Sequence, residues 1–125
     1  VETLSLDALI AFTEGSKASI GVSAHGDTSM ETLATYAQHA DYIQLMGIVE
    51  IGAQGNPFDE AVLQKISSLR KQFPEKSIGV DGSVNKDTIA RIKAAGADRF
   101  ICGSAIVGQD DPVQAHADLI SLIND

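Results

Sequence analysis

The chain has no tryptophan, a single cysteine and only three prolines among its 125 residues. One cysteine excludes an internal disulfide and a cysteine-based zinc cluster, so no covalent link closes the fold. Structural disulfides belong to oxidising compartments, and we therefore expect a cytoplasmic protein. Because Cys102 lies in the apolar run 100–102, we interpret it as a buried, unreactive thiol.

Long apolar runs and positive charge are scarce as well. No apolar stretch approaches the ~20 residues that a membrane-spanning helix needs, and we expect no membrane partner. Nine basic residues stand against seventeen acidic ones, a formal net charge of −8. Such a chain repels a phosphate backbone, which argues against nucleic acid as a partner. The acidic residues are scattered along the chain rather than gathered in a tail, as is typical of a solvated surface.

What the chain does have is an apolar pattern that switches repeatedly between a strand period and a helix period. An initial helix is expected over residues 6–14, followed by four strands that each lead into a helix. The expected strands are residues 18–22, 42–46, 77–80 and 99–102. Strands that alternate with helices imply right-handed crossovers and a parallel sheet. The predicted fold class is α/β, with four parallel βα units in one domain over residues 1–125.

Capping residues mark the helix starts. Residues 28–31 (T-S-M-E) match a capping box, Asn85 is a good N-cap, and Asp111 precedes a proline suited to the first helical position. The third helix is expected to open at Asp59. The apolar side chains expected to face the core from the first and last helices are Leu6, Leu9, Ile10, Phe12, Leu119, Ile120 and Ile123.

Two loops that follow neighbouring strands carry glycine and small polar residues. In parallel α/β folds ligands bind at the carboxyl ends of strands, and in (β/α)8 barrels a phosphate sits on the last two such loops beside a short extra helix. Gly82, Ser83, Gly103 and Ser104 fit that pattern, and residues 105–107 suit the short helix. The alternative is that these glycines only form turns, but a pair of such loops favours a phosphate site.

Asp81 is the most informative single residue. A carboxylate at the end of a parallel strand can act as a general acid or base, or bind a metal. It can equally form a turn, although Asn85 is available to cap the next helix. The histidines His25, His39 and His116 lie on a turn and in helices, and we interpret them as ordinary surface residues rather than ligands.

These segments resemble one known family. Residues 78–84 (I-G-V-D-G-S-V) are similar to the V-D-G-G-V segment of ribulose-phosphate 3-epimerases, and residues 102–106 (C-G-S-A-I) to their A-G-S-A-I-F. Residues 50–58 resemble E-P-G-F-G-G-Q-K-F, and residues 1–3 resemble V-E-A-T at the end of the family's fourth strand. The resemblance implies half of a (β/α)8 TIM barrel, with this chain as strands five to eight.

The resemblance also implies roles. The family epimerises a pentulose 5-phosphate at C3 through a metal-stabilised enediolate, with two aspartates as acid and base and a divalent metal, usually zinc, on both aspartates and two histidines. Asp81 would be one of those aspartates and a metal ligand, and Met46 would flank the enediolate. Gly82, Ser83, Gly103 and Ser104 would bind the phosphate. Here Ser83 replaces a family glycine, and Gly47 and Ile51 alter the loop after Met46.

The other aspartate and both histidines belong to strands that this chain does not contain. We therefore expect an epimerase-like fragment that is inactive without its N-terminal half. The alternative is a non-catalytic phosphate-binding or assembly module. Another phosphate-binding barrel is a third possibility. A hexulose-phosphate epimerase or the α subunit of tryptophan synthase would fit, but the latter does not explain Asp81.

A half-barrel also raises the question of assembly. Residues 18–22 and 99–102 would be unpaired strand edges, and an apolar interior would be uncovered. Reburied apolar surface contributes about 25 cal/mol per Å2. We therefore expect a homo-oligomer in which two half-barrels close on each other.

Overall fold

The computed structural model describes residues 1–48 and 57–124. Four strands form one sheet in the order β1-β2-β3-β4, and every neighbouring pair is parallel. The strands are β1 (Gly21–Ala24), β2 (Tyr42–Met46), β3 (Ser77–Asp81) and β4 (Arg99–Ile101). The helices are α1 (Leu6–Gly15), α2 (Met30–Ala37), α3 (Ala61–Gln72), α4 (Ile89–Ala95), α5 (Ser104–Val107) and α6 (Pro112–Asn124).

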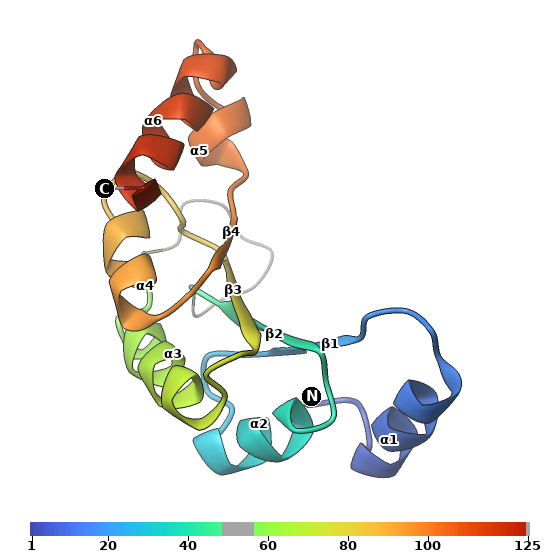
Figure 1. Ribbon diagram of the computed structural model, residues 1–125. Helices are drawn as coiled ribbons and strands as arrows, with labels where there is room; N and C mark the ends of the chain where they lie inside the picture. Colours follow the sequence, from blue (N-terminus) through green and yellow to red (C-terminus); the bar gives the residue numbers. More distant parts are fainter. Residues whose placement is uncertain (49–56, 125) are drawn as a thin grey trace.

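Helices α2, α3 and α4 lie side by side along one face of the sheet, and its other face is left open (Figure 1). The covered face carries Ile43 and Leu45 from β2 and Ile78 and Val80 from β3, all of them completely buried. These side chains meet Ile66 and other apolar residues of the helix layer in one core. A curved parallel sheet with helices on one side only is half of a (β/α)8 barrel, as predicted.

The opposite face, called the open face below, is formed by the alternate strand residues. These are Gly21, Ser23, Tyr42, Gln44, Met46, Ser77, Gly79, Asp81, Arg99 and Ile101. Only Met46 and Ile101 among them are large aliphatic side chains, so the predicted apolar interior is wrong. The strands looked apolar in the sequence because their polar residues are fewer than their apolar ones. Most of the apolar residues face the helices, and the open face has most of the polar ones.

The first strand lies further along the chain than expected. Residues 18–22 were predicted, but β1 spans Gly21–Ala24. Ile20 instead exchanges hydrogen bonds with Asp41 just before β2 begins: its amide donates to the Asp41 carboxylate at 2.7 Å, and its carbonyl accepts from the Asp41 amide at 2.7 Å. The polar Ser23 looked like the end of the strand in the sequence. It lies within β1 on the open side of the sheet, and the next residue, Ala24, is fully buried.

Two of the predicted helix caps are shifted. Ser29, not Thr28, is the N-cap of α2, and its hydroxyl accepts from the amide of Thr32 at 3.2 Å. Asn85 begins a turn ahead of α4, whose N-cap is Thr88. Asp111 caps α6 as predicted, since its carboxylate accepts from the Gln114 amide at 3.0 Å.

Two apolar residues expected in the core are exposed. Phe12 on α1 is 62% exposed and Ile120 on α6 is 39% exposed, whereas Leu9 and Leu119 on the same helices are buried. Both helices lie at the ends of the sheet, where fewer neighbours cover them (Figure 1). His39 follows α2 rather than lying within a helix.

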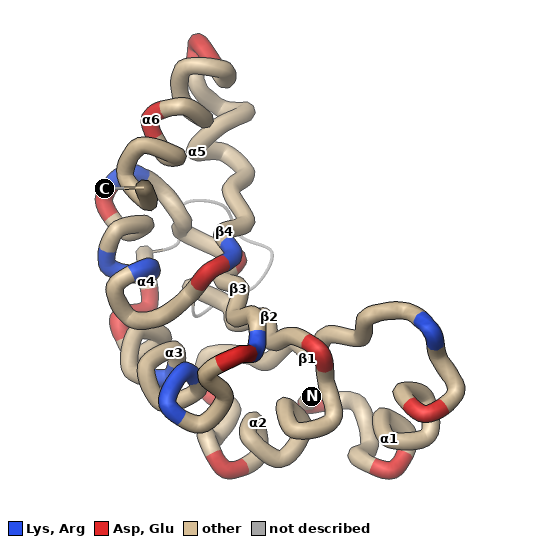
Figure 2. Tube along the Cα trace, viewed as in Figure 1, with Lys and Arg blue, Asp and Glu red and all other residues tan. Residues whose placement is uncertain are grey.

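Charged residues of both signs are spread over the helices and turns rather than gathered in one block (Figure 2). Lys86 pairs with Asp118 at 2.8 Å and Arg91 with Glu60 at 2.7 Å. These pairs join neighbouring helical units on the surface. Over residues 1–48 and 57–124, none of the helices has the length and apolar character that crossing a bilayer requires.

Because Ile43 is completely buried between sheet and helices, we predict that Ile43→Ala lowers the free energy of unfolding by about 2–5 kcal/mol. Ile120→Ala removes an exposed side chain of the same size and should cost less than about 1 kcal/mol. Urea denaturation followed by circular dichroism measures both values. Equal losses for the two variants would contradict the assigned core.

Candidate functional site

The register of the strands brings the predicted catalytic residues to one edge. Met46 is the last residue of β2 and pairs with Asp81, the last residue of β3, which in turn pairs with Ile101 of β4. Met46 and Asp81 both belong to the open face and are partly exposed. Their side chains therefore lie next to each other at the carboxyl ends of two central strands.

The loop after β3 has an unusual backbone. Gly82 has a φ of 105° and Ser83 a φ of 53°, and Ser83 is the one non-glycine residue with positive φ in the described ranges. A side chain at φ near +53° costs about 1–2 kcal/mol relative to glycine. The glycine expected at this position by family resemblance is thus the residue that the backbone prefers.

Close contacts hold this loop against the end of β2. The Gly47 amide donates to the Asp81 carbonyl at 2.8 Å, and a Cβ on Gly47 would collide with the Gly82 carbonyl. Ile48 lies against Gly82, where an added Cβ would be 3.1 Å from its side chain. Gly47, a departure from the family pattern, is therefore required by this close approach. Residues 50–56 of the glycine-rich loop lie outside the described part of the chain.

Thr88 fixes the far side of the same loop. It is a buried polar residue, and its hydroxyl donates to the Ser83 carbonyl at 2.6 Å and accepts from the Asn85 amide at 3.0 Å. Thr88 orients the peptide that follows Ser83. Sequence reasoning missed this residue because a threonine ahead of a helix suggests only a cap.

The loop after β4 leads directly into α5. Gly103 is the N-cap and Ser104 the first residue of this short helix, and the Gly103 carbonyl accepts from the amides of Ile106 and Val107. The amides of Ser104 and Ala105 belong to the first turn, which has no helical acceptors. Apart from its two chain neighbours, no atom of the described residues lies within 4 Å of the position that a Cβ on Gly103 would take. Because β3 and β4 are neighbours, this loop lies beside Gly82 and Ser83.

Cys102 directly follows β4 and precedes Gly103. Burial raises the pKa of its thiol, and the nearby Asp81 carboxylate raises that pKa further. The thiol is half-buried rather than fully buried as predicted. A raised pKa keeps it protonated and poorly nucleophilic near neutral pH, so the predicted lack of reactivity fits.

Glu2 reaches the same edge of the sheet from the start of the chain. Its carboxylate accepts hydrogen bonds from the Thr28 hydroxyl and from the His25 amide, the latter at 3.0 Å. Burial alone raises the pKa of Glu2, but these hydrogen bonds outweigh it and lower the pKa to about 2. The resemblance of residues 1–3 to a strand end was the only sequence signal for this position.

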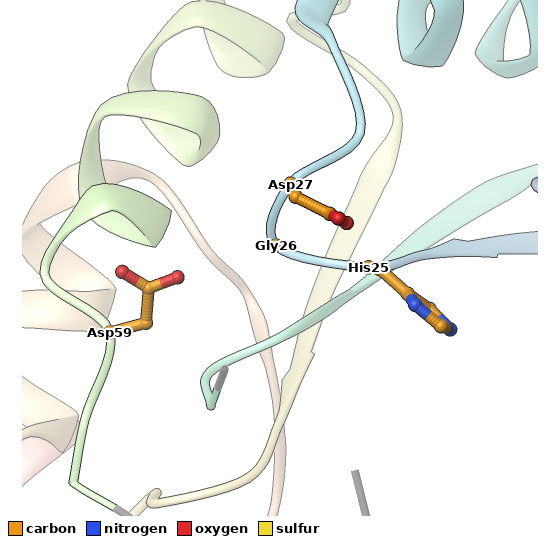
Figure 3. A pocket seen from close by; sticks show the side chains of 4 residues that line it. All are labelled: His25, Gly26, Asp27 and Asp59. Atoms are coloured by element: carbon orange, nitrogen blue, oxygen red, sulfur yellow. The ribbon is translucent and has the colours of Figure 1, made fainter. Parts of the chain in front are cut away.

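A shallow pocket of about 210 Å3 lies between the turn after β1 and the start of α3. His25, Gly26, Asp27 and Asp59 line it (Figure 3). The His25 side chain points away from Asp59 (Figure 3). Lys65 of α3 donates to the carbonyls of Gly26 and Thr28 and so fixes the turn.

The metal predicted from resemblance needs more donors than this edge offers. Within residues 1–48 and 57–124, no three histidine, cysteine, aspartate or glutamate side chains come together as a metal site. Asp81 at the strand end can provide one carboxylate, whereas His25 follows β1, His39 follows α2 and His116 lies within α6. The donors present here do not make a complete site for the ion.

Fold and strand-end residues together define the second half of a (β/α)8 barrel. The family model described as "Ribulose-phosphate 3 epimerase family" matches residues 6–107. The chain belongs to the ribulose-phosphate 3-epimerase family.

Curated relatives agree with this assignment. The chain is 37% identical over 109 residues to a ribulose-phosphate 3-epimerase of Mycobacterium tuberculosis, covering 84% of this chain and 46% of the relative. It is 32% identical over 111 residues to the enzyme of the same name from Bacillus subtilis, covering 85% and 50%. The chain thus spans about half the length of the curated relatives it matches.

Solved structures agree on the fold. A 3-hexulose-6-phosphate synthase superposes with a TM-score of 0.73 at 21% identity, over 97% of this chain and 58% of the other. An orotidine 5'-monophosphate decarboxylase from Sulfolobus solfataricus gives 0.66 at 20% identity, over 97% and 56%. The half-barrel prediction is confirmed.

Two substitutions at one position test the strained loop. Ser83→Ala and Ser83→Gly both remove the hydroxyl, but only glycine relieves the positive φ. We predict that the glycine variant is more stable than the alanine variant by about 1 kcal/mol. Thermal unfolding of both proteins measures the difference. Equal stabilities would contradict the backbone geometry at Ser83.

The lowered pKa of Glu2 predicts a pH effect. Because the folded-state pKa is about 2 and the ordinary value is 4.5, the stabilisation by this carboxylate is complete above pH 4.5 and is lost as the pH falls towards 2. Melting temperatures from pH 6 down to pH 2 should therefore fall more steeply for the wild type than for Glu2→Gln. Asp110→Asn, which changes an exposed acidic residue, should keep the wild-type profile.

Proposed function

We propose that this chain supplies the C-terminal half of the active site of a ribulose-phosphate 3-epimerase-like enzyme acting on a pentulose 5-phosphate. The observation that carries the proposal is the pairing of Met46 with Asp81 at the sheet edge, next to the positive-φ loop at Gly82 and Ser83. Ketose-phosphate epimerisation needs an acid/base group and a phosphate site close together, and loops at neighbouring strand ends are suited to supply both.

Asp81 is the proposed acid/base. Its carboxylate takes the proton from C3 of the sugar, and the electron pair of that bond moves into an enediolate that includes the neighbouring carbonyl. Return of a proton to the other face of C3 completes the epimerisation. That step needs a second acid on the opposite side of the sugar, which the missing half-barrel would contribute. Met46 beside Asp81 gives the intermediate an apolar neighbour.

The proposed phosphate site uses backbone amides rather than charged side chains. Successive amides in a turn with positive φ form a concave anion-binding nest. The loop after β3 has two successive residues with positive φ, Gly82 and Ser83, which supports the proposal. Gly103 and Ser104 add the first-turn amides of α5 from the neighbouring strand end. Amides of this kind bind an anion without adding charge to a chain that is already at −8.

Activity of the chain by itself is the first test. With one of two required acid/base groups, the purified chain should show no turnover of ribulose 5-phosphate in a coupled assay. Mixing with a complementary N-terminal half-barrel should restore turnover, which Asp81→Asn should then reduce by at least about 100-fold. Asp87→Asn, on an exposed turn, serves as the control. Turnover by the chain alone would contradict the proposal.

Phosphate binding is the second test and needs no partner. Titration with inorganic phosphate, followed by amide NMR, should shift Gly82, Ser83, Gly103 and Ser104 together. Shifts confined to the surroundings of Lys71 or Lys76 would count against the site. Phosphate binding with no activity in the presence of the complementary half would favour the alternative, a non-catalytic phosphate-binding module.

A further inference from the structure

One histidine lies at the same edge of the sheet as the proposed active site. His25 directly follows β1. The last pair between β1 and β2 joins Ala24 to Leu45, so the next residues along the two strands are His25 and Met46. Met46 in turn pairs with Asp81 on β3. His25, Met46 and Asp81 therefore follow one another in a row across the carboxyl ends of three neighbouring strands.

The imidazole of His25 faces the same side of the sheet as Met46 and Asp81. Side chains alternate between the two faces along a strand, and the residue before His25, Ala24, is fully buried against the helices. Figure 3 shows the His25 side chain pointing away from Asp59, which precedes α3. His25 is also exposed. Its imidazole is thus accessible to a ligand that lies over Asp81 and Met46.

Two charged side chains hold the turn that carries His25. The Glu2 carboxylate accepts hydrogen bonds from the His25 amide at 3.0 Å and from the Thr28 hydroxyl. The Lys65 ammonium on α3 donates to the carbonyls of Gly26 and Thr28. The Thr28 amide closes the turn by donating to the His25 carbonyl at 3.2 Å. The backbone of His25 is therefore fixed while its side chain stays exposed, which suits a contact that is in place before its ligand arrives.

The strand order relates His25 to one end of the proposed substrate. With the phosphate on the loops after β3 and β4 and C3 of the sugar at Asp81, the enediolate carbons lie beside Met46 on β2. C1 is on the other side of C3 from the phosphate, so it extends away from β4 and towards β1. Neighbouring strands are about 4.8 Å apart, which puts β1 about 10 Å from β3. The ketose chain and the His25 side chain fill that distance from its two ends.

We propose that His25 binds the C1 hydroxyl of the pentulose 5-phosphate and so recognises the unphosphorylated end of the substrate. This inference rests on the proposed function, from which it takes the positions of the phosphate and of C3. A neutral imidazole has one donor and one acceptor nitrogen, and a hydroxyl both donates and accepts. A site built to hydrogen-bond a hydroxyl discriminates against an analogue that lacks it. His25 is therefore a specificity-determining residue for ketose phosphates with a hydroxyl at C1.

The experiment measures the binding of matched ligands to the full chain by amide NMR titration. The ligands are inorganic phosphate, xylulose 5-phosphate and 1-deoxyxylulose 5-phosphate, which lacks only the C1 hydroxyl. Each is titrated into the wild type, into His25→Ala and into His39→Ala. His39 is the matched control because it is also exposed but follows α2. Both variants change an exposed side chain, and their amide spectra establish that they are folded.

We expect the wild type to bind xylulose 5-phosphate about three- to tenfold more tightly than the 1-deoxy analogue, the gain from one hydrogen bond. His25→Ala should abolish that difference and keep the affinity for inorganic phosphate within about twofold, and His39→Ala should behave as the wild type.

Equal wild-type affinities for the two sugar phosphates, or a difference that survives in His25→Ala, would overturn this inference and leave the proposed function intact. A loss in His25→Ala that all the ligands share, inorganic phosphate included, would assign His25 to support of the loop and would also overturn it. Failure of the wild-type chain to bind phosphate at the loops after β3 and β4 would overturn the proposed phosphate site as well.

Discussion

The parallel register between β2 and β3 determines where Met46, Asp81 and the loop after them lie. Once Ile43 pairs with Ile78 and Leu45 with Val80, both pairs face the helices, and Met46 and Asp81 must end together on the other side. A slip of one residue would move Asp81 to the covered face and expose the core residues to water. The burial of four aliphatic side chains thus fixes the position of one carboxylate.

The same register brings the following loops into contact, and the sequence adjusts to the crowding. Gly47 is needed because the backbone after β2 passes directly over the Gly82 carbonyl. Ser83 keeps a left-handed backbone that costs free energy for any residue with a side chain. Thr88 and Ile48 hold the loop from its two sides. Strain that is supported by surrounding contacts is common at functional sites, where the backbone must take one particular shape.

The elements that sequence reasoning placed well are those whose two faces differ in polarity most clearly. Residues 42–46 were predicted as a strand and observed as β2 because Ile43 and Leu45 alternate with exposed-side residues. The first strand was misplaced because glycine, serine and alanine carry little polarity contrast, although Ala24 is fully buried. Tyr42 covers Gly21 at the start of this strand, a contact between residues that are twenty-one positions apart.

The residues of the candidate site also differ in how clearly the sequence reveals them. Asp81 and the loop glycines were recognisable because strand ends in this fold class concentrate chemistry. Thr88 and Glu2 were not, since each acts through a hydrogen bond to a distant or unremarkable backbone group. The positive φ of Ser83 could be inferred only from the glycine that resembling sequences have at that place. The local sequence pattern predicts the helices and strands. The hydrogen bonds and close contacts between them form only in the folded chain and cannot be inferred from that pattern.

The polarity of the open face changes what a half-barrel needs from its other half. An apolar interior would be covered by any apolar surface, including a second copy of the same chain. A face with serine, glutamine, aspartate and arginine can remain hydrated when uncovered, and it becomes favourable to bury only against groups that satisfy its polar atoms. Arg99 adds a positive charge to this face, beside the Tyr42 ring. The polar atoms of the open face therefore set the condition that any covering surface must meet.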